Sequence, residues 1–153
     1  MSATSIISYN VNGIRAATKK GLLDWLKEED PDIFLMQETK AQPEQLDESL
    51  IQPEGYHAYY YSAEKKGYSG VAIFSKEEPK HIEYGCGLEK YDVEGRVIRA
   101  DYDGYSVISV YFPSGTRGGD RQIYKEDFLK DFLAYLQELR KSYPNLIISG
   151  DYN

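Results

Sequence analysis

Short apolar runs alternate with polar turns along the whole chain, which is typical of a protein built from many short strands. Seven runs are rich in Ile, Val, Tyr and Phe and are bounded by Gly, Pro or charged residues. We predict strands over residues 5–10, 32–38, 57–63, 70–75, 96–102, 106–112 and 146–153. The Asp103-Gly104 pair between two of these runs indicates an antiparallel hairpin. The runs IFLM and LII do not alternate, so they favour strands that are covered on both faces.

Two longer segments carry apolar residues at helical spacing. Residues 19–29 form the first, which Pro31 ends, and residues 121–143 form the second, which Pro144 ends. We expect the stripe of Phe and Leu along the second helix to lie in the core. A weaker helix is expected near residues 43–50. Helices between some strands and hairpins between others favour a layered α/β sandwich.

Length and composition fit one globular domain. The 153 residues suffice for a real core, and no apolar run approaches the roughly 20 residues of a membrane helix. The N-terminal segment lacks the basic and long apolar regions of a signal peptide, so we expect an intracellular protein. The one cysteine, Cys86, excludes an intrachain disulfide. His57 and His81 have no metal-like neighbours in sequence, and we expect both to be structural.

The charge balance restricts the partners. The net charge is -7, from 25 acidic and 18 basic residues, which weighs against a non-specific nucleic-acid coat. It leaves room for an enzyme with a local basic rim around a carboxylate site. Tyrosine is unusually frequent, at 15 residues, and it suits both strands and contact with nucleotides.

Oxygen-bearing side chains follow three of the predicted strands. Asn10 and Asn12 end the first, Glu38 ends the second, and Asp151 and Asn153 end the last. Such groups converge at one edge of a layered α/β sheet, where ligands bind. Carboxylates beside amides, with no Cys or His nearby, suit Mg²⁺ or Mn²⁺ rather than zinc. The alternative is that each is an ordinary turn residue, because Asn and Asp are common after strands.

The motifs in full carry a resemblance to a known family. SYNVNGIRA, LMQETK, GYSGVAIFSK, EGRVI, YFP and GDYN, in this order, resemble the exonuclease III and abasic-site endonuclease family of the endonuclease/exonuclease/phosphatase superfamily. The resemblance implies the N-terminal part of a four-layer α/β sandwich, in which helices flank two packed mixed sheets. Residues 1–153 would form the N-terminal portion of a single domain, truncated after GDYN.

The same resemblance implies a metal site. Glu38 would ligate Mg²⁺, with Mn²⁺ as a possible substitute, and Asn10 and Asn12 would lie beside the metal and its water. Asn12 replaces an acidic residue found in some members. With one charge fewer, the site would bind its metal more weakly.

Four residues would act on the phosphate. The resemblance implies that Tyr111 holds the scissile phosphate and that Asp151 aligns or deprotonates the attacking water. Asn153 would support the phosphate, and Asn10 would complete the catalytic set. Ser114 stands where the family often has Asn, so no phosphate contact is carried over to it.

Five further residues would lie along the DNA. The resemblance implies DNA-binding roles for Arg15, Tyr68, Arg96, Arg117 and Arg121. Taken without it, Tyr68 is a plain loop tyrosine, and Arg117 and Arg121 are solvated charges at a helix start.

The activity implied is that of a DNA-repair hydrolase. It would cleave the phosphodiester 5′ to abasic sites with Mg²⁺, and remove nucleotides or blocking groups from 3′ ends. Its partner would be double-stranded DNA with abasic sites or 3′ ends, with no membrane. The alternatives are a non-catalytic fragment that binds DNA or a partner, and a superfamily phosphatase that acts on another phosphate ester. It would be cytoplasmic and nucleoid-associated in a bacterium, or nuclear in a eukaryote.

The family continues beyond GDxN, which implies that part of the site is absent. The further part would supply a second sheet layer, another Asp and a late Asp-His pair. We therefore expect this chain to hold about half the site, to expose a sheet face, and to be inactive or self-associating alone. The full-length enzyme is expected to be a monomer.

Overall fold

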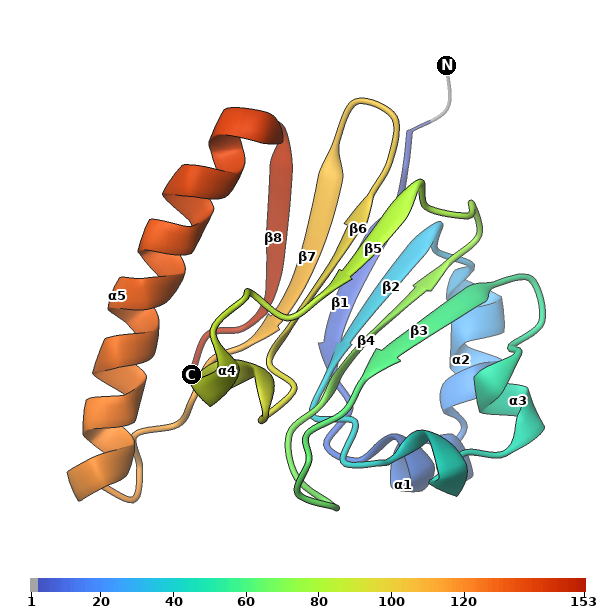
Figure 1. The fold of residues 1–153 in the computed structure, drawn as a ribbon. Coiled ribbons are helices and arrows are strands. Elements are labelled where there is room, and N and C mark those ends of the chain that lie inside the picture. The colour runs from blue at the N-terminus through green and yellow to red at the C-terminus, as the bar shows by residue number, and fades with distance from the viewer. Residues whose placement is uncertain (1–2) are drawn as a thin grey trace.

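Two four-stranded sheets lie face to face, with helices on their outer sides, in the computed structural model, which describes residues 3–153 (Figure 1). The first sheet has the order β1 (Ile6–Asn10), β2 (Ile33–Gln37), β4 (Val71–Ser75), β3 (His57–Tyr61). The second has the order β5 (His81–Tyr84), β6 (Val97–Asp101), β7 (Ser106–Tyr111), β8 (Leu146–Asp151). Each sheet contains one parallel pair, β1–β2 or β7–β8, beside antiparallel pairs.

Helices cover the outer face of each sheet. The outer face of the first sheet carries α1 (Ile14–Lys19), α2 (Leu22–Glu29), the short 3₁₀ helix η1 (Pro43–Gln45) and α3 (Glu48–Ile51). The second sheet is covered by α4 (Glu89–Asp92) and the long α5 (Gly119–Ser142). The four-layer α/β architecture predicted from the sequence is therefore confirmed. No described helix is long and apolar enough to cross a membrane.

The core between the sheets comes from the non-alternating strands. Leu35 of β2 and Ile73 of β4 pack against Ile98 of β6 and Val107 of β7, and all four are fully buried. The sequence-based expectation that the chain lacks a second sheet layer is wrong, because residues 81–151 form that layer. Each sheet covers the inner face of the other, so the expected exposed sheet face does not occur.

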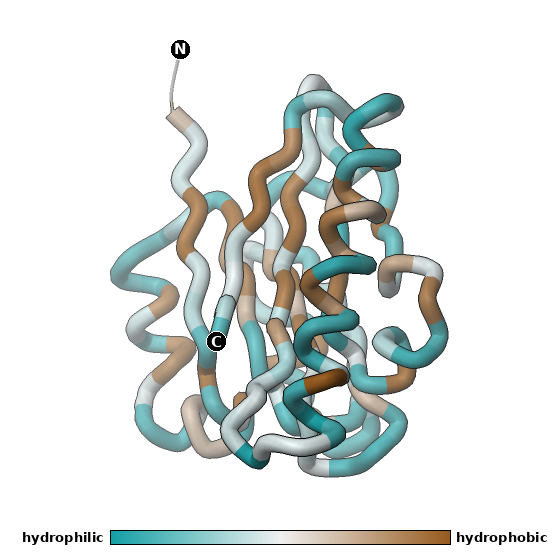
Figure 2. Tube along the Cα trace, turned by 90° about the vertical axis from the view of Figure 1, so that its left-hand side faces the viewer, coloured by the Kyte–Doolittle hydropathy of each residue, from teal (hydrophilic) through white to brown (hydrophobic). Residues whose placement is uncertain are grey.

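Two edge strands, β1 of the first sheet and β8 of the second, lie on the same side of the sandwich. Among the described residues, β1 pairs with β2 alone and β8 pairs with β7 alone, while β3 and β5 form the other two edges. Strands β1 and β8 lie close together, as Figure 2 shows for the strand that leads from the N-terminus and the one that leads to the C-terminus. Figure 2 also shows hydrophobic runs along the strands and hydrophilic loops at their ends.

Three sequence predictions need correction. The helix expected over residues 19–29 begins later, at Leu22, because Gly21 has a left-handed backbone (φ +101°) that separates α2 from α1, a helix that was not predicted from the sequence. Strand β5 was missed because its sequence, HIEY, is mostly exposed and polar. The stripe of α5 is only partly core. Phe128 and Phe132 are buried, but the adjacent Leu133 is 57% exposed because it points away from the sheet.

Candidate active site

The polar ends of the parallel pairs meet at one end of the sandwich. In the first sheet Asn10 lies opposite Gln37, the residue before Glu38. In the second sheet Tyr111 lies opposite Asp151. Parallel strands carry their C-terminal ends to the same side, so both pairs deliver polar groups to a common edge. The convergence predicted from the strand ends is present.

Asn10 connects the two carboxylates of this edge. Its side-chain nitrogen donates to Glu38 Oε1 at 2.9 Å and to Asp151 Oδ2 at 2.7 Å. Glu38 follows the first sheet and Asp151 ends the second, so one amide spans both sheets. A neutral donor between two acids satisfies both without adding a positive charge. Residues 10, 38 and 151 thus form one hydrogen-bonded group, which we call the carboxylate cluster.

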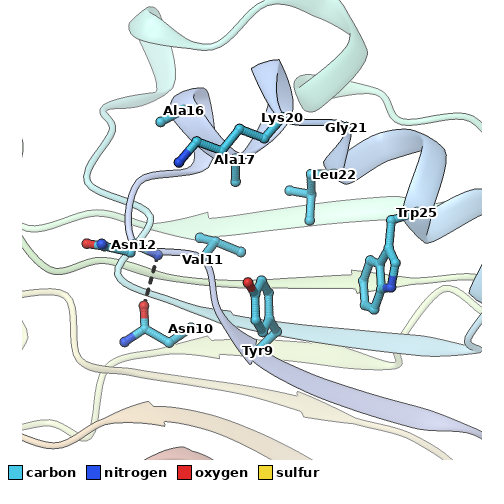
Figure 3. A pocket seen from close by; sticks show the side chains of 10 residues that line it. All are labelled: Tyr9, Asn10, Val11, Asn12, Ala16, Ala17, Lys20, Gly21, Leu22 and Trp25. Carbon is cyan, nitrogen blue, oxygen red and sulfur yellow. Dashed lines mark hydrogen bonds between the residues drawn. The ribbon is translucent and has the colours of Figure 1, made fainter.

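Asn12 lies at the rim of the carboxylate cluster and is held by a lysine. Its backbone N–H donates to Asn10 Oδ1 at 2.9 Å, which Figure 3 shows as a dashed line. Its side-chain oxygen accepts from Lys40 Nζ at 2.7 Å. Lys40 Nζ is also 3.6 Å from Glu38 Oε2. An ammonium group therefore lies between Asn12 and Glu38, two of the three residues that the resemblance assigns to a metal.

The donor set fits a hard cation. Glu38, Asp151 and the Asn12 side chain offer carboxylate and amide oxygens, which Mg²⁺ and Mn²⁺ prefer. Within residues 3–153 no three acidic, histidine or cysteine side chains gather into a complete metal cage. Mg²⁺ commonly keeps several waters and uses one or two carboxylates, so this set fits it. The Lys40 ammonium would have to leave Asn12 when the cation binds.

A hollow opens beside Asn10 and Asn12 along the free edge of β1. Its volume is about 550 Å³. Tyr9, Trp25 and Lys20 line it from β1, α2 and the end of α1 (Figure 3). The Tyr9 and Trp25 rings are 6.1 Å apart. Of the carboxylate cluster, Asn10 lines this hollow.

Tyr111 is kept protonated beside the carboxylate cluster. Burial, and then the charge of Glu38 and a hydrogen bond to it, raise the pKa of Tyr111 to about 12. Arg96 opposes this rise, but its effect is smaller. At neutral pH the phenol is thus an O–H donor next to an anionic site.

Asn153 is hydrogen-bonded to the residue that follows β7 and to Asp151. Its side-chain nitrogen donates to the carbonyl of Phe112 at 2.7 Å, and its backbone N–H donates to Asp151 Oδ1 at 3.0 Å. Lys125 of α5 donates to the Asn153 carbonyl at 2.6 Å. The structure thus places Asn153 as a support for Asp151, and its predicted contact with phosphate stays a prediction.

A second group of polar residues lies on the other side of Tyr111, and we call it the arginine cluster: Tyr68, Glu94, Arg96 and Arg121. Glu94 Oε1 accepts from Arg96 at 2.6 Å and from Arg121 at 3.1 Å. It also accepts from the Tyr68 hydroxyl at 3.1 Å. Both guanidinium groups in turn donate to that hydroxyl at 3.0 Å. One carboxylate therefore bridges two guanidinium groups, and the cluster keeps one net positive charge.

Arg96 differs from its predicted role. It is 1% exposed, so it does not reach a DNA backbone in this structure. It donates to the backbone carbonyl of Tyr111 at 3.0 Å, and its guanidinium lies 5.1 Å from the Tyr111 ring centroid. The motif EGRVI predicted an arginine at the site but not its burial. We therefore replace the predicted DNA contact of Arg96 with a role in holding Tyr111.

The remaining predicted DNA-binding residues are accessible. Arg15 is exposed on α1 and donates to the Lys40 carbonyl at 3.2 Å. Arg117 is exposed in the loop between β7 and α5. Arg121, at the start of α5, and Tyr68 are partly exposed. All four lie on loops or helix starts around the carboxylate cluster, and their binding to DNA stays a prediction.

Sequence reasoning missed Lys40 and Glu94. Both belong to the motifs that carry the resemblance, LMQETK and EGRVI, and each lies two residues from a predicted functional residue of opposite charge. That charge was the signal that could have identified them. Although burial opposes its ionisation, hydrogen bonds from Arg121 and Arg96 lower the pKa of Glu94 below its ordinary value.

Comparison with known proteins assigns the family. The profile of the Endonuclease/Exonuclease/phosphatase family matches residues 7–153, almost the whole chain. The chain belongs to this family. Its members are generally metal-dependent nucleases, in keeping with the oxygen donors at the carboxylate cluster.

The similar proteins are named as nucleases, and one of them as a DNA repair nuclease. The chain is 47% identical to an exodeoxyribonuclease of Bacillus subtilis, over 97% of this chain and 58% of that protein. It is 43% identical to the DNA repair nuclease APEX1 of Danio rerio, over 97% of this chain and 48% of that protein. A solved AP endonuclease from Archaeoglobus fulgidus is 35% identical, with a TM-score of 0.84 over 98% of this chain and 57% of that chain. The chain thus spans about half the length of the relatives it matches.

Proposed function

We propose that this chain forms part of a Mg²⁺-dependent DNA-repair nuclease that hydrolyses the phosphodiester 5′ to abasic sites and processes 3′ ends. The observation that carries the proposal is the single amide of Asn10, which joins Glu38 of one sheet to Asp151 of the other. Tyr111 adds a protonated donor beside them. Together these groups provide a base, oxygen ligands for a cation, and a hydrogen-bond donor for the phosphate in one place.

The base in this proposal is Asp151. Its carboxylate would align an attacking water and take its proton, a role for which a fixed acceptor within hydrogen-bond reach is required. Asn10 fixes Oδ2 and the backbone N–H of Asn153 fixes Oδ1, so both oxygens are oriented. A carboxylate held in this way does not have to reorganise when the water is bound.

The negative charge that develops on the phosphate needs donors. Tyr111 would donate its hydroxyl proton to a non-bridging phosphate oxygen, because its raised pKa keeps it protonated. Glu38 and Asn12 would hold the divalent cation, which supplies charge stabilisation and a more acidic water when bound. Asn10 adds no charge that would repel the substrate.

The basic residues around the carboxylate cluster would hold the DNA backbone. Arg15 and Arg117 are exposed and oriented to solvent, which suits contact with phosphates that carry no sequence information. An abasic nucleotide is unstacked at low cost, so extrusion into a pocket selects it. A solved neighbour, a 3′ phosphatase from Neisseria bound to a product DNA hairpin, supports DNA as the substrate.

The test is incision of a labelled duplex that carries one abasic site, with Mg²⁺ and with EDTA. Three proteins are compared: this chain, the full-length Bacillus subtilis relative, and a chimera in which residues 1–153 replace the matched half of that relative. Glu38→Gln in the chimera is the negative control. Metal-dependent incision by the chimera, lost in Glu38→Gln, supports the proposal.

The other outcomes are equally informative. Incision by the chain alone means that these residues suffice and that the expectation of half a site is wrong. A chimera that folds and binds DNA but never incises, beside an active full-length relative, refutes the proposal.

The second candidate is a module that binds DNA or a partner without turnover. It is favoured by Lys40, whose ammonium group lies between Asn12 and Glu38, where the cation would bind. DNA binding by the chain that persists in EDTA, without incision by the chain or the chimera, would establish it.

The open edges of β1 and β8 also support self-association of the chain, which light scattering over a range of concentrations tests.

A further inference from the structure

A buried side-chain amide links the two sheets just beneath the carboxylate cluster. Gln37 is the last residue of β2 and is 1% exposed. Its side-chain nitrogen donates to Ser8 Oγ of β1 and to Ser109 Oγ of β7, both at 3.1 Å. Ser109 Oγ donates in turn to the carbonyl of Met36 at 3.1 Å. The first sheet is thus hydrogen-bonded to the second through side chains at this point.

The position of this link relative to the site follows from strand geometry. Side chains two residues apart on a strand share a face and lie about 7 Å apart along it. Ser8 is two residues before Asn10, and Ser109 is two residues before Tyr111. Gln37 directly precedes Glu38. The link therefore joins the three strands that deliver Asn10, Glu38 and Tyr111.

The surroundings make the link specific. Around this link the core between the sheets is formed by apolar side chains such as Leu35 and Ile73, whose contacts have no preferred direction. A buried amide must keep its partners, because an unpaired donor in such a core is costly. A shift of β2 against β7 would break the bond to Ser109. The amide therefore selects one register of the two sheets.

We propose that Gln37 is a positioning residue that fixes the register of the two sheets at the site. The carboxylate cluster needs this register, because Asn10 bonds to Glu38 in its own sheet and to Asp151 in the other. The activity that Gln37 would support is the one proposed above, so the test includes a readout that does not depend on activity.

The variants are Gln37→Met, which keeps length and volume but removes both donors, and a matched control, Tyr102→Phe. Tyr102 donates its buried hydroxyl to Ser75 Oγ at 2.8 Å, which is also a hydrogen bond between the sheets. Ser75 lies at the opposite end of the sandwich, beside the start of β2 at Ile33. The control thus removes a link of the same kind far from the site.

Two readouts are compared. In NMR spectra we expect the side-chain amide signals of Asn10 to shift and exchange faster in Gln37→Met, and to match the wild type in Tyr102→Phe. In the protein form that incises abasic DNA we expect kcat to fall about tenfold to 100-fold in Gln37→Met with KM little changed. Both variants should melt at a lower temperature.

Ser109→Ala tests whether the effect of Gln37→Met comes from the hydrogen bond between the two sheets. It removes the partner on the second sheet, so it should disturb the Asn10 signals in the same direction and add little to Gln37→Met in the double variant. If Gln37→Met does not fold, Ser8→Ala and Ser109→Ala carry the test. Unchanged Asn10 signals in folded variants, or equal effects in Tyr102→Phe, would overturn the proposal. Wild-type protein inactive in every form would refute the proposed function while the NMR comparison still decides the role of Gln37.

Discussion

The carboxylate cluster and the arginine cluster lie on either side of Tyr111 and satisfy their charges in opposite ways. In the carboxylate cluster two acids share one neutral amide, and the nearest cation, Lys40, lies at its rim. In the arginine cluster one acid, Glu94, accepts from two arginines and a tyrosine. The carboxylate cluster keeps a net negative charge, which a cation can balance. In the arginine cluster every charged side chain already has a partner of opposite charge. We therefore propose the carboxylate cluster as the reactive one, whereas the arginine cluster contacts Tyr111 through Arg96.

The largest effect should come from Asp151. Asp151→Asn keeps the shape of the side chain but removes the base, so we expect incision by the active form to fall about 10² to 10⁴-fold. The fold should be retained, because Asn10 can still bond to the amide oxygen. Single-turnover incision measures the loss, and Asp103→Asn, an exposed acid of the β6–β7 turn, is the matched control. A loss below threefold would remove Asp151 from the mechanism.

Arg96 tests whether the arginine cluster is structural. Arg96→Met keeps much of the packing but removes a buried charge that Glu94 and the Tyr111 carbonyl require. We expect the free energy of unfolding to drop by about 3 kcal/mol, as for a buried pair that loses one partner. Urea unfolding measures it. Arg117→Met, at an exposed position, should change stability by less than about 0.5 kcal/mol. Equal stability of the two variants would contradict the comparison.

Gly70 tests how the backbone places Glu38. The backbone N–H groups of Thr39 and Lys40 donate to the carbonyls of Gly70 and Ser69, at 3.2 and 2.8 Å. A Cβ on Gly70 would overlap with Thr39 Oγ1, so Gly70→Ala must displace the side chain of Thr39, the residue that directly follows Glu38. We expect kcat of the active form to fall about tenfold to 100-fold.

The control for Gly70→Ala matches its backbone. Gly104 has nearly the same φ, +88° against +92°, but its added Cβ meets nothing within 4 Å. Gly104→Ala should therefore lose similar stability from the left-handed backbone and keep its activity. Thr39→Ala should restore part of the activity of Gly70→Ala. Failure of that rescue would mean that the strained backbone, and not the overlap, displaces Glu38.

Salt dependence compares the arginines that can meet DNA. Arg117 is exposed, so Arg117→Ala should reduce the slope of log affinity against log salt by about one. Arg121 is already paired with Glu94, so Arg121→Ala should reduce it by clearly less. Binding of the duplex in EDTA at several salt concentrations measures both slopes. Equal reductions would show that the arginine cluster opens when DNA binds.

The sequence predicted the carboxylate cluster better than the arginine cluster, for a physical reason. Asn10, Glu38 and Asp151 follow apolar strands, and strand ends must converge once the strands form sheets. The strands themselves could be predicted because their apolar runs are long enough to be buried. Charged residues on loops pair through tertiary contacts. The hydrogen bonds of Glu94 with Arg96 and Arg121 therefore correspond to no pattern in the sequence.

The missed elements have the same origin. Strand β5 is an exposed edge whose residues need no apolar pattern, and only its pairing with β6 makes it a strand. Leu133 follows the helical repeat of its neighbours, but one face of α5 alone meets the sheet, so the repeat overstated the core. Gln37 was read as part of a motif, yet its burial between two sheets emerges only when both are present.

The smallest effect should be a change of stability with pH that depends on Glu94. Its pKa is lowered from an ordinary value of 4.5, so the folded state favours the charged form. The stabilisation is therefore present above pH 4.5 and is lost as the pH falls towards the lowered pKa. The stability advantage of the wild type over Glu94→Gln, measured by urea unfolding, should be largest near pH 7 and shrink towards pH 3. Glu54→Gln, at an exposed position, should show no such trend. An advantage that stays constant with pH would mean that Glu94 gains nothing from its two arginines, and the contrast between the two clusters would then rest on geometry alone.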